Sequence, residues 1–301
     1  MEFEWILAEY QHIKQILYVS GLASNEKDPV KRITLELKDG RSFELSITSE
    51  STERGQVGFS GRITGLEAKE GINAELVFQL CSDALIRISE PVQHMLRRDP
   101  YHKLQFRFYD MLKSIKSGRI LEIGSRNLSG VTRREMIPDD MEYVGFDIME
   151  GENVALVGDV HNLSKIVKSC SFDAVFSISV FEHLIMPWKA AVEINRVLKT
   201  GGLFMAATHQ TFPIHEIPND FFRFSDNAWK GLFNTETGFE IIDAVMGEKA
   251  FISGNYLHQV TAGMEHAMAY LGSCVLVKKI GESKVDWPVD SDRIIQKPYP
   301  R

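Results

Sequence analysis

The spacing of hydrophobic residues along the chain changes near residue 95. Before this point apolar and polar residues alternate over short runs, which is typical of strands with one buried face. Residues 33–37 and 43–47 alternate in this way on either side of Asp39-Gly40, a pair that favours a two-residue hairpin turn. Further strands are expected at residues 57–63, 76–80 and 84–88. The region from about residue 20 to residue 90 therefore predicts a small antiparallel sandwich or barrel.

The first residues of the chain show a different spacing. Apolar residues recur there at helical intervals: Ile6, Tyr10, Ile13 and Leu17. Residues 3–19 therefore predict a helix, although residues 16–19 could also begin a strand. Residues 1–95 are expected to form an N-terminal domain, in which this helix precedes the small β domain. Packing or homo-oligomerisation is the expected role of this domain, and glycan binding is the alternative.

After residue 95, helical and strand patterns alternate. A helical stripe of apolar residues comes first: Leu104, Phe108, Met111, Leu112 and Ile115. Apolar runs the length of buried strands follow at residues 120–123, 143–146, 172–176 and 203–207. This alternation predicts an α/β domain over residues 96–281, with a parallel sheet and helices on both faces. Residues 282–301 are expected to form a surface tail.

Residues suited to ligand binding lie at the ends of the predicted strands or just after them. They are Glu122 and Gly124 at the end of the first strand, Asp147 after the second, Asp159 in the next turn, and the Glu182-His183 pair after the run at 172–176. The carboxyl ends of parallel strands meet at one edge of a sheet, where ligands bind in such folds. A carboxylate at the position of Asp147 could accept hydrogen bonds from both hydroxyls of a ribose.

Three motifs give this region a family resemblance. The sequence ILEIGSRNLSG lies at residues 120–130, EH at 182–183 and RVLKTGG at 196–202. In this order they resemble the class I S-adenosylmethionine-dependent methyltransferases, over roughly residues 100–281. The resemblance implies a Rossmann-like seven-stranded sheet that residues 238–242 and 273–277 close as an antiparallel hairpin.

The same resemblance implies the cofactor and the residues that hold it. S-adenosylmethionine would be the methyl donor and S-adenosylhomocysteine the product. The positions that match the family's cofactor site are Glu122, Gly124, Ser125, Arg126, Asp147, Ile148, Asp159, Val160, Ser177 and Ile178. In this assignment Glu122 and Gly124 hold the methionine end, Asp147 the ribose, and Asp159 with Val160 the adenine.

Arg126 departs from the family pattern, because it stands where the second glycine of a GxGxG loop is usual. One reading is loop variation without an effect on binding. In a second, Arg126 binds the carboxylate of the methionine moiety, a geometry that suits a guanidinium. In a third, its bulk narrows the cofactor site. A nicotinamide-binding unit is the less favoured reading of this loop. It needs three close glycines for the pyrophosphate, whereas here an arginine separates Gly124 from Gly130.

Residues 208–224, after the fifth predicted strand, carry the candidate acceptor chemistry. Transfer to a hydroxyl requires a proton acceptor, and histidine suits that task near neutral pH. His209 is the expected base, followed by His183 and then His215, although each could serve only in packing or capping. Asp220 and Arg223 are expected to contact the substrate or to pair and order the loop. No metal is expected; the alternative is a divalent metal bound by His183, His209, His215 and Asp220.

Composition narrows the setting and the partners. The 301 residues are 44% hydrophobic, which is sufficient for a packed core, and no apolar run reaches the length of a membrane span. The three cysteines, Cys81, Cys170 and Cys274, are too widely spaced for a metal ribbon and favour a reducing, cytoplasmic compartment. The net charge is −7 and no basic stripe is present, so a nucleic-acid partner is not expected.

We therefore interpret the sequence as a methyltransferase acting on oxygen, with a sugar, glycan or related small molecule as the acceptor. N-, C- or carboxyl methylation of another metabolite is the alternative among enzymes. A non-catalytic scaffold that keeps the fold is the alternative outside them, although the presence of Asp147, Asp159 and the Glu182-His183 pair disfavours it. The N-terminal β domain is the expected surface for homo-oligomer formation.

Overall fold

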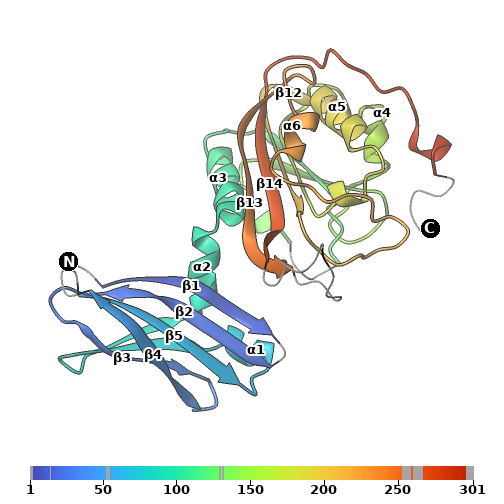
Figure 1. Ribbon diagram of the computed structural model, residues 1–301. Helices are drawn as coiled ribbons and strands as arrows, with labels where there is room; N and C mark the ends of the chain where they lie inside the picture. Colours follow the sequence, from blue (N-terminus) through green and yellow to red (C-terminus); the bar gives the residue numbers. More distant parts are fainter. Residues whose placement is uncertain are drawn as a thin grey trace. The chain divides into compact units, whose positions relative to one another are not determined.

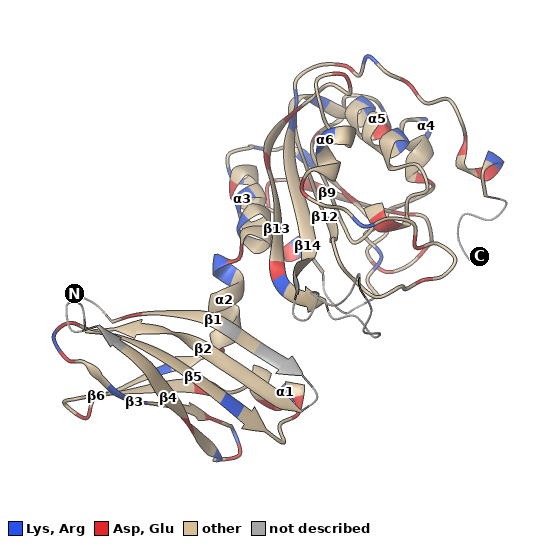
Figure 2. Ribbon diagram, viewed as in Figure 1, with Lys and Arg blue, Asp and Glu red and all other residues tan. Residues whose placement is uncertain are grey.

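A computed structural model describes residues 3–13, 15–51, 55–128, 130, 132–252, 259 and 267–295. It divides the chain into two compact units, Met1–Arg98 and Asp99–Arg301, whereas the sequence pattern placed the division near residue 95 (Figure 1). Among the described residues, no helix is long and apolar enough to cross a membrane. Lys and Arg are interspersed with Asp and Glu in both units (Figure 2).

The first unit is built on a seven-stranded antiparallel sheet in the order β1-β2-β5-β4-β3-β6-β7. Its strands are β1 (Glu4–Ile13), β2 (Ile16–Ser24), β3 (Val30–Glu36), β4 (Ser42–Ser51), β5 (Gln56–Thr64), β6 (Glu75–Leu80) and β7 (Leu85–Ser89). Two helices, α1 (Ala68–Ile72) and α2 (Pro91–Arg98), complete it. Apolar residues from both halves of the sheet, such as Val19, Ile33 and Phe78, pack into one core. The sequence prediction of a small antiparallel β domain agrees with this arrangement.

The predicted N-terminal helix over residues 3–19 is wrong, because β1 and β2 form an antiparallel pair there. Leu17, Val19 and Ala23 are buried at even spacings along β2, which is the period of a strand. A spacing of four residues fits one face of a regular strand as well as of a helix. In β1 a bulge between Leu7 and Glu9 shifts the register, so Ile6 is exposed whereas Tyr10 packs against the core. The apolar pattern alone was therefore ambiguous, and pairing between the two segments decides the conformation.

The hairpin predicted around Asp39-Gly40 is present, with Ile33 opposite Leu45. Its turn is one residue longer than predicted. The Leu37 amide donates to the Arg41 carbonyl at 2.8 Å, so three residues lie between them. Gly40 supplies the positive φ of +91° that such a turn requires at its end.

The second unit contains the seven-stranded sheet that the family resemblance implied. Its strands are β8 (Arg119–Ile123), β9 (Glu142–Asp147), β10 (Leu156–Val157), β11 (Phe172–Ile178), β12 (Leu198–His209), β13 (Phe239–Ile252) and β14 (Ala267–Lys279). Their order is β10-β9-β8-β11-β12-β14-β13, parallel except for β14, which pairs antiparallel with both β12 and β13. The parallel strands therefore end at one edge of the sheet.

Helices cover both faces of this sheet. On one face, Leu104, Phe108 and Leu112 of α3 (Pro100–Leu112) pack into a core with β11, β12 and β14. The helices α4 (Leu163–Ile166), α5 (Pro187–Val197) and α6 (Ala228–Leu232) pack on the other face. Between β8 and β9 the described residues form only the 3₁₀ turn η1 (Arg134–Met136), where a helix was expected. The loop after β8 therefore borders the sheet edge without a covering helix.

Most described residues after Gly281 are exposed, as expected of a surface segment. Its described residues lie against the second unit, where Lys189 of α5 donates to the Val289 carbonyl at 2.6 Å. The 3₁₀ turn η4 (Ser291–Arg293) begins with Ser291, which is only 3% exposed. The prolines in this segment gave no sign of such docking, because docking depends on contacts with residues that are far away in the sequence.

Candidate functional site

The second unit holds a cavity of about 380 Å³ at the carboxyl ends of its parallel strands. This volume lies within the range of small-molecule sites. Of the ten cofactor positions expected from the sequence, all except Ser177 line it. The Ser177 side chain instead donates to the Ile123 carbonyl at 3.2 Å and joins β11 to β8. The candidate histidines His183, His209 and His215 line the same cavity.

Gly124 forms the turn that brings the loop after β8 to the cavity. Its φ is +82°, and a β-carbon at this position would lie 2.2 Å from Cγ2 of Val180. Only glycine can therefore occupy it without moving the neighbouring loop. The Gly124 amide donates to the Phe146 carbonyl at 2.8 Å, which fixes the turn beside the end of β9.

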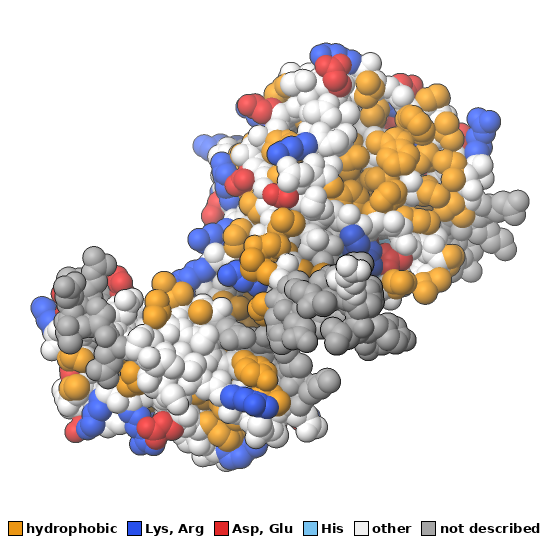
Figure 3. Space-filling model, in the orientation of Figure 1, with side chains coloured by type: hydrophobic (Ala, Val, Ile, Leu, Met, Phe, Trp, Pro, Cys, Tyr) orange, Lys and Arg blue, Asp and Glu red, His pale blue; other side chains and the backbone are white. Residues whose placement is uncertain are grey.

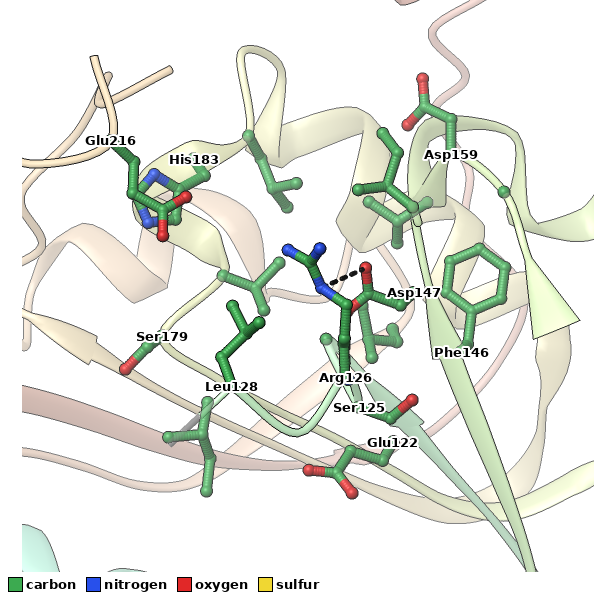
Figure 4. Close-up of a pocket in the computed structure, with 18 of the residues that line it drawn as sticks. Glu122, Ser125, Arg126, Leu128, Phe146, Asp147, Asp159, Ser179, His183 and Glu216 are labelled. Atoms are coloured by element: carbon green, nitrogen blue, oxygen red, sulfur yellow. Dashed lines mark hydrogen bonds and ion pairs between the residues drawn. The ribbon is translucent and has the colours of Figure 1, made fainter. Parts of the chain in front are cut away.

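Asp147 at the end of β9 is held in place by the backbone. One carboxylate oxygen accepts from the Arg126 amide at 3.2 Å and the other from the Met149 amide at 3.0 Å. The side chain of Arg126 extends into the cavity, and its Nε lies 3.9 Å from Asp147 Oδ1 (Figure 4). This Nε is buried and has no hydrogen-bond acceptor within the described part of the chain, so it is an unsatisfied donor at the cavity.

Asp159 lies across the cavity from His183 (Figure 4). It accepts hydrogen bonds from the His161 ring at 2.6 Å and from the Ser291 hydroxyl of the C-terminal segment. Burial alone would raise the pKa of this carboxyl, but the hydrogen bond and charge of His161, together with Ser291, lower the pKa to about 2. The Asp159 carboxylate is therefore ionised at neutral pH.

Glu122 lies at the end of β8 in a less polar setting. It accepts a hydrogen bond from the Tyr143 hydroxyl, and Arg133 Nη1 is 3.7 Å from its other oxygen. Burial raises the pKa of Glu122, while Tyr143 and Arg133 partly offset that rise. The sequence did not single out either of these partners.

The three candidate histidines meet at one end of the cavity. The ring centroids of His183 and His215 are 4.8 Å apart, and those of His209 and His215 are 5.3 Å apart. Nδ1 of His183 lies 2.8 Å from the Asn219 carbonyl oxygen, and Nε2 of His209 lies 3.3 Å from Oε1 of Glu182. The structure thus brings together three histidines that are separated by up to 32 positions in the chain.

The surroundings of His209 lower the pKa of its imidazole. Burial lowers the pKa of its imidazole; the nearby His215, Arg223 and His183 lower it further, and only Glu182 opposes them. Its ring also stacks on Phe212, with centroids 4.0 Å apart. The neutral form of His209 is therefore favoured, and this form can accept a proton or bind a cation.

Asp220 and Arg223 are not among the residues that line the cavity, and they pair with each other, which is the second of the two roles expected for them. They form a bidentate ion pair with distances of 2.5 and 2.7 Å. Asp220 also accepts from the His215 amide at 3.0 Å, and Arg223 donates to the carbonyls of Phe212 and Pro213. The pKa of Asp220 is held well below its usual range, chiefly by the hydrogen bond from Arg223. The pair orders the loop that carries His215.

Sequence reasoning missed several cavity residues. They are Leu128, Arg133, Asn153, His161, Ser179, Glu216, Phe221 and Ile295. Most follow a strand end by a few residues and could have been found by extending each predicted loop. Ile295 could not, because it belongs to the C-terminal segment whose docking has no local sequence signal.

Comparisons with known proteins bear on the second unit. Residues 123–206 match a family model described as a methyltransferase domain. This match agrees with the class I S-adenosylmethionine-dependent methyltransferase predicted from the motifs, and the family implies S-adenosylmethionine as the cofactor. No curated protein matches the chain.

Several solved structures with partial similarity are described as methyltransferases, and one is described as a [4+2]-cyclase. An S-adenosylmethionine-dependent methyltransferase from Archaeoglobus fulgidus is 16% identical, with a TM-score of 0.42 over 59% of this chain and 92% of that one. A methyltransferase from Bacillus halodurans is 12% identical, with a TM-score of 0.43 over 57% and 98%. The CurJ carbon methyltransferase is 18% identical, with a TM-score of 0.38 over 55% of this chain, and the match spans 49% of that chain. Similarity at this level does not inform the chemistry of the site.

Proposed function

We propose that the chain is an S-adenosylmethionine-dependent O-methyltransferase whose acceptor is a hydroxyl of a sugar, glycan or related small molecule. The observation that carries this proposal is the composition of one cavity. Asp147, Arg126 and Asp159 provide polar groups for a nucleoside with an amino-acid tail, and three imidazoles stand at the other end. The methyltransferase domain match covers the strand ends from which most of these groups come.

The residues present fit the cofactor that the family implies. Asp147 faces the cavity as a hydrogen-bond acceptor for ribose hydroxyls. The buried Nε of Arg126 lacks an acceptor, and the carboxylate of a methionine moiety would supply one. Asp159 is ionised and can accept from an adenine amino group. When bound, S-adenosylmethionine supplies a methyl group whose carbon an incoming oxygen can attack, with the positively charged sulfur as the leaving group.

The structure favours His183 over His209 as the group that takes the acceptor's proton. The Asn219 carbonyl can only accept, so the hydrogen of the His183 ring lies on Nδ1 and the lone pair on Nε2. His183 lines the cavity, and its orientation is fixed by this bond. His209 instead directs Nε2 toward Glu182. A fixed imidazole with a free lone pair meets the geometric requirement of a general base.

Incubation of the full chain with methyl-labelled S-adenosylmethionine and a panel of nucleotide sugars and free glycans tests the proposal. We expect label in an ether that survives mild alkali, and incorporation that is roughly 10²–10⁴-fold slower with His183→Gln. Label in an alkali-sensitive ester, in an amine or on carbon would instead support one of the other methyltransferase classes. A folded protein that binds no cofactor would support the scaffold alternative.

A further inference from the structure

The buried carboxylate of Glu182 lies next to the rings of His183 and His209. Glu182 is completely buried, and one of its oxygens accepts from the Thr208 hydroxyl. No described residue donates a hydrogen bond to the other oxygen, Oε1. A buried acceptor without a partner is costly, and a carboxylate more so, unless a cation approaches it. Oε1 is the oxygen nearest to the His183 and His209 rings.

Two of the imidazoles are placed to supply ligand atoms beside this oxygen. One ligand atom each from Glu182, His209 and His215 lie within 4.8 Å of one another. The Nε2 of His209 is 3.3 Å from Oε1 of Glu182. Ligands about 2.0–2.2 Å from a tetrahedral zinc ion lie roughly 3.3–3.6 Å apart, so this pair already has the required separation.

The hydrogen bonds of His215 leave its outer nitrogen available. Its Nδ1 is 3.1 Å from the Pro213 carbonyl, which can only accept, so the lone pair of the neutral ring lies on Nε2. A ring hydrogen donated to a backbone carbonyl is the usual outer contact of a metal-binding histidine.

We propose that Glu182, His209 and His215 bind a divalent transition-metal ion, with the open position facing the cavity. Two imidazoles and one carboxylate suit zinc, cobalt or iron better than magnesium, which prefers oxygen ligands. Asp220, which the sequence had grouped with the histidines, is excluded as a ligand because Arg223 occupies both of its oxygens. The binding itself is independent of the proposed function.

The role of the metal rests on the proposed O-methylation. An acceptor hydroxyl bound at the open position would lose its proton more easily, because the cation stabilises the oxygen anion. His183 is not among the three ligands and keeps Nε2 free to receive that proton. The oxygen then forms its bond to the methyl carbon as the carbon–sulfur bond breaks, and the neutral thioether leaves.

Titration of the chelator-stripped full chain with ZnCl₂, and separately with CoCl₂, tests the binding. We expect one equivalent of either ion to bind, and bound cobalt to show the visible absorption of a four-coordinate nitrogen and oxygen site. Excess MgCl₂ should not displace either ion. His209→Ala and His215→Ala should weaken binding by at least about 100-fold, which is the upper end of the effect of losing even an outer contact.

His102→Ala is the matched control, because His102 also contacts a carboxylate, Glu248 at 2.8 Å, but is not part of a three-ligand group. Binding that is unchanged in the His209 and His215 variants, or no binding by the folded wild-type chain, would overturn the proposal. S-adenosylhomocysteine titrated into the same samples separates the two ideas. Cofactor binding without metal binding refutes only the metal site, and metal binding without cofactor binding refutes only the methyltransferase. The wild-type titration and cobalt spectrum decide the question even if a variant fails to fold.

Discussion

Arg126 is the residue at which the chain departs from the pattern of the family it resembles, and its replacement by alanine gives the most discriminating prediction. Its side chain extends into the cavity beside Asp147, and its buried Nε has no hydrogen-bond acceptor among the described residues. If this group binds the cofactor's carboxylate, Arg126→Ala removes an attractive contact. If it only obstructs the ribose site, the same change removes a barrier. The two readings therefore predict opposite signs.

The magnitude follows from the type of contact. A hydrogen bond to a charged group contributes about 1.5–3 kcal/mol, and 1.4 kcal/mol corresponds to a tenfold change in affinity. We therefore expect Arg126→Ala to weaken S-adenosylhomocysteine binding by roughly 10- to 150-fold. 5′-Methylthioadenosine has the same nucleoside but no amino-acid carboxylate. Its affinity should stay constant or rise, because Asp147 loses its nearby guanidinium.

Calorimetric titration of wild type and variant with both ligands measures this difference. Arg119→Ala is the control, since Arg119 pairs with Glu142 at the opposite end of β8. Tighter binding of both ligands by Arg126→Ala would refute the carboxylate contact and show that the arginine obstructs the site. An equal loss for both ligands would show that Arg126 acts on the nucleoside instead.

Three further predictions concern other parts of the cavity. Asp147→Asn should weaken S-adenosylmethionine binding by about 1–3 kcal/mol, because the charge of the ribose acceptor is lost. Calorimetry measures this change, and Asp139→Asn at an exposed position is the control. Unchanged affinity would remove Asp147 from the site. His183→Gln should lower turnover by roughly 10²–10⁴-fold with cofactor affinity preserved, and normal turnover in a correctly folded variant would end its assignment as the base. The pKa of Asp159 is lower in the folded chain, about 2, than its ordinary value of 3.8. The ionised carboxylate therefore stabilises the fold by about 2 kcal/mol at pH values above 3.8, and this stabilisation is lost as the pH falls toward 2. The difference in unfolding free energy between wild type and Asp159→Asn should therefore shrink as the pH falls from 4 toward 2, and a difference that does not change over this range would contradict the assignment.

The parts of the fold that depend on local pattern could be predicted from the sequence. The runs at 120–123 and 172–176 are buried on both faces of a parallel sheet, which leaves an unbroken apolar signature. The hairpin at residues 33–47 was found for the opposite reason, since one face is buried and the residues alternate. The strands β1 and β2 were not found, because their apolar spacing fits two periods and only their mutual pairing resolves it.

The candidate site shows the same division. Gly124, Asp147 and Asp159 could be identified because each follows a strand end directly, where the fold itself places side chains at the cavity. The docking of Ser291 on Asp159 could not, because the two are 132 residues apart and neither residue type signals the contact. The unpartnered oxygen of Glu182 was equally invisible, since only the packed structure shows which donors fail to reach it.

An apolar area lies on the face of the second unit shown in Figure 3, in the region of α5. Trp188 of α5 and Trp287 of the C-terminal segment are both partly exposed, and their ring centroids are 5.8 Å apart. The C-terminal segment therefore covers part of α5 with an aromatic contact as well as with the hydrogen bonds of Lys189. Its attachment to the unit that holds the cavity has both apolar and polar components.

The central claim is that the cavity of the second unit binds S-adenosylmethionine through its strand-end residues. Calorimetric titration of the wild-type chain with S-adenosylmethionine, followed by displacement with S-adenosylhomocysteine, tests it most directly. The account predicts one-to-one binding of both ligands at the same site, with no binding of NAD, because Gly124 and Gly130 flank an arginine where a pyrophosphate would need glycine. A protein that shows a cooperative thermal melt yet produces no binding heat at several temperatures, and no shift of that melt with either ligand, would contradict it.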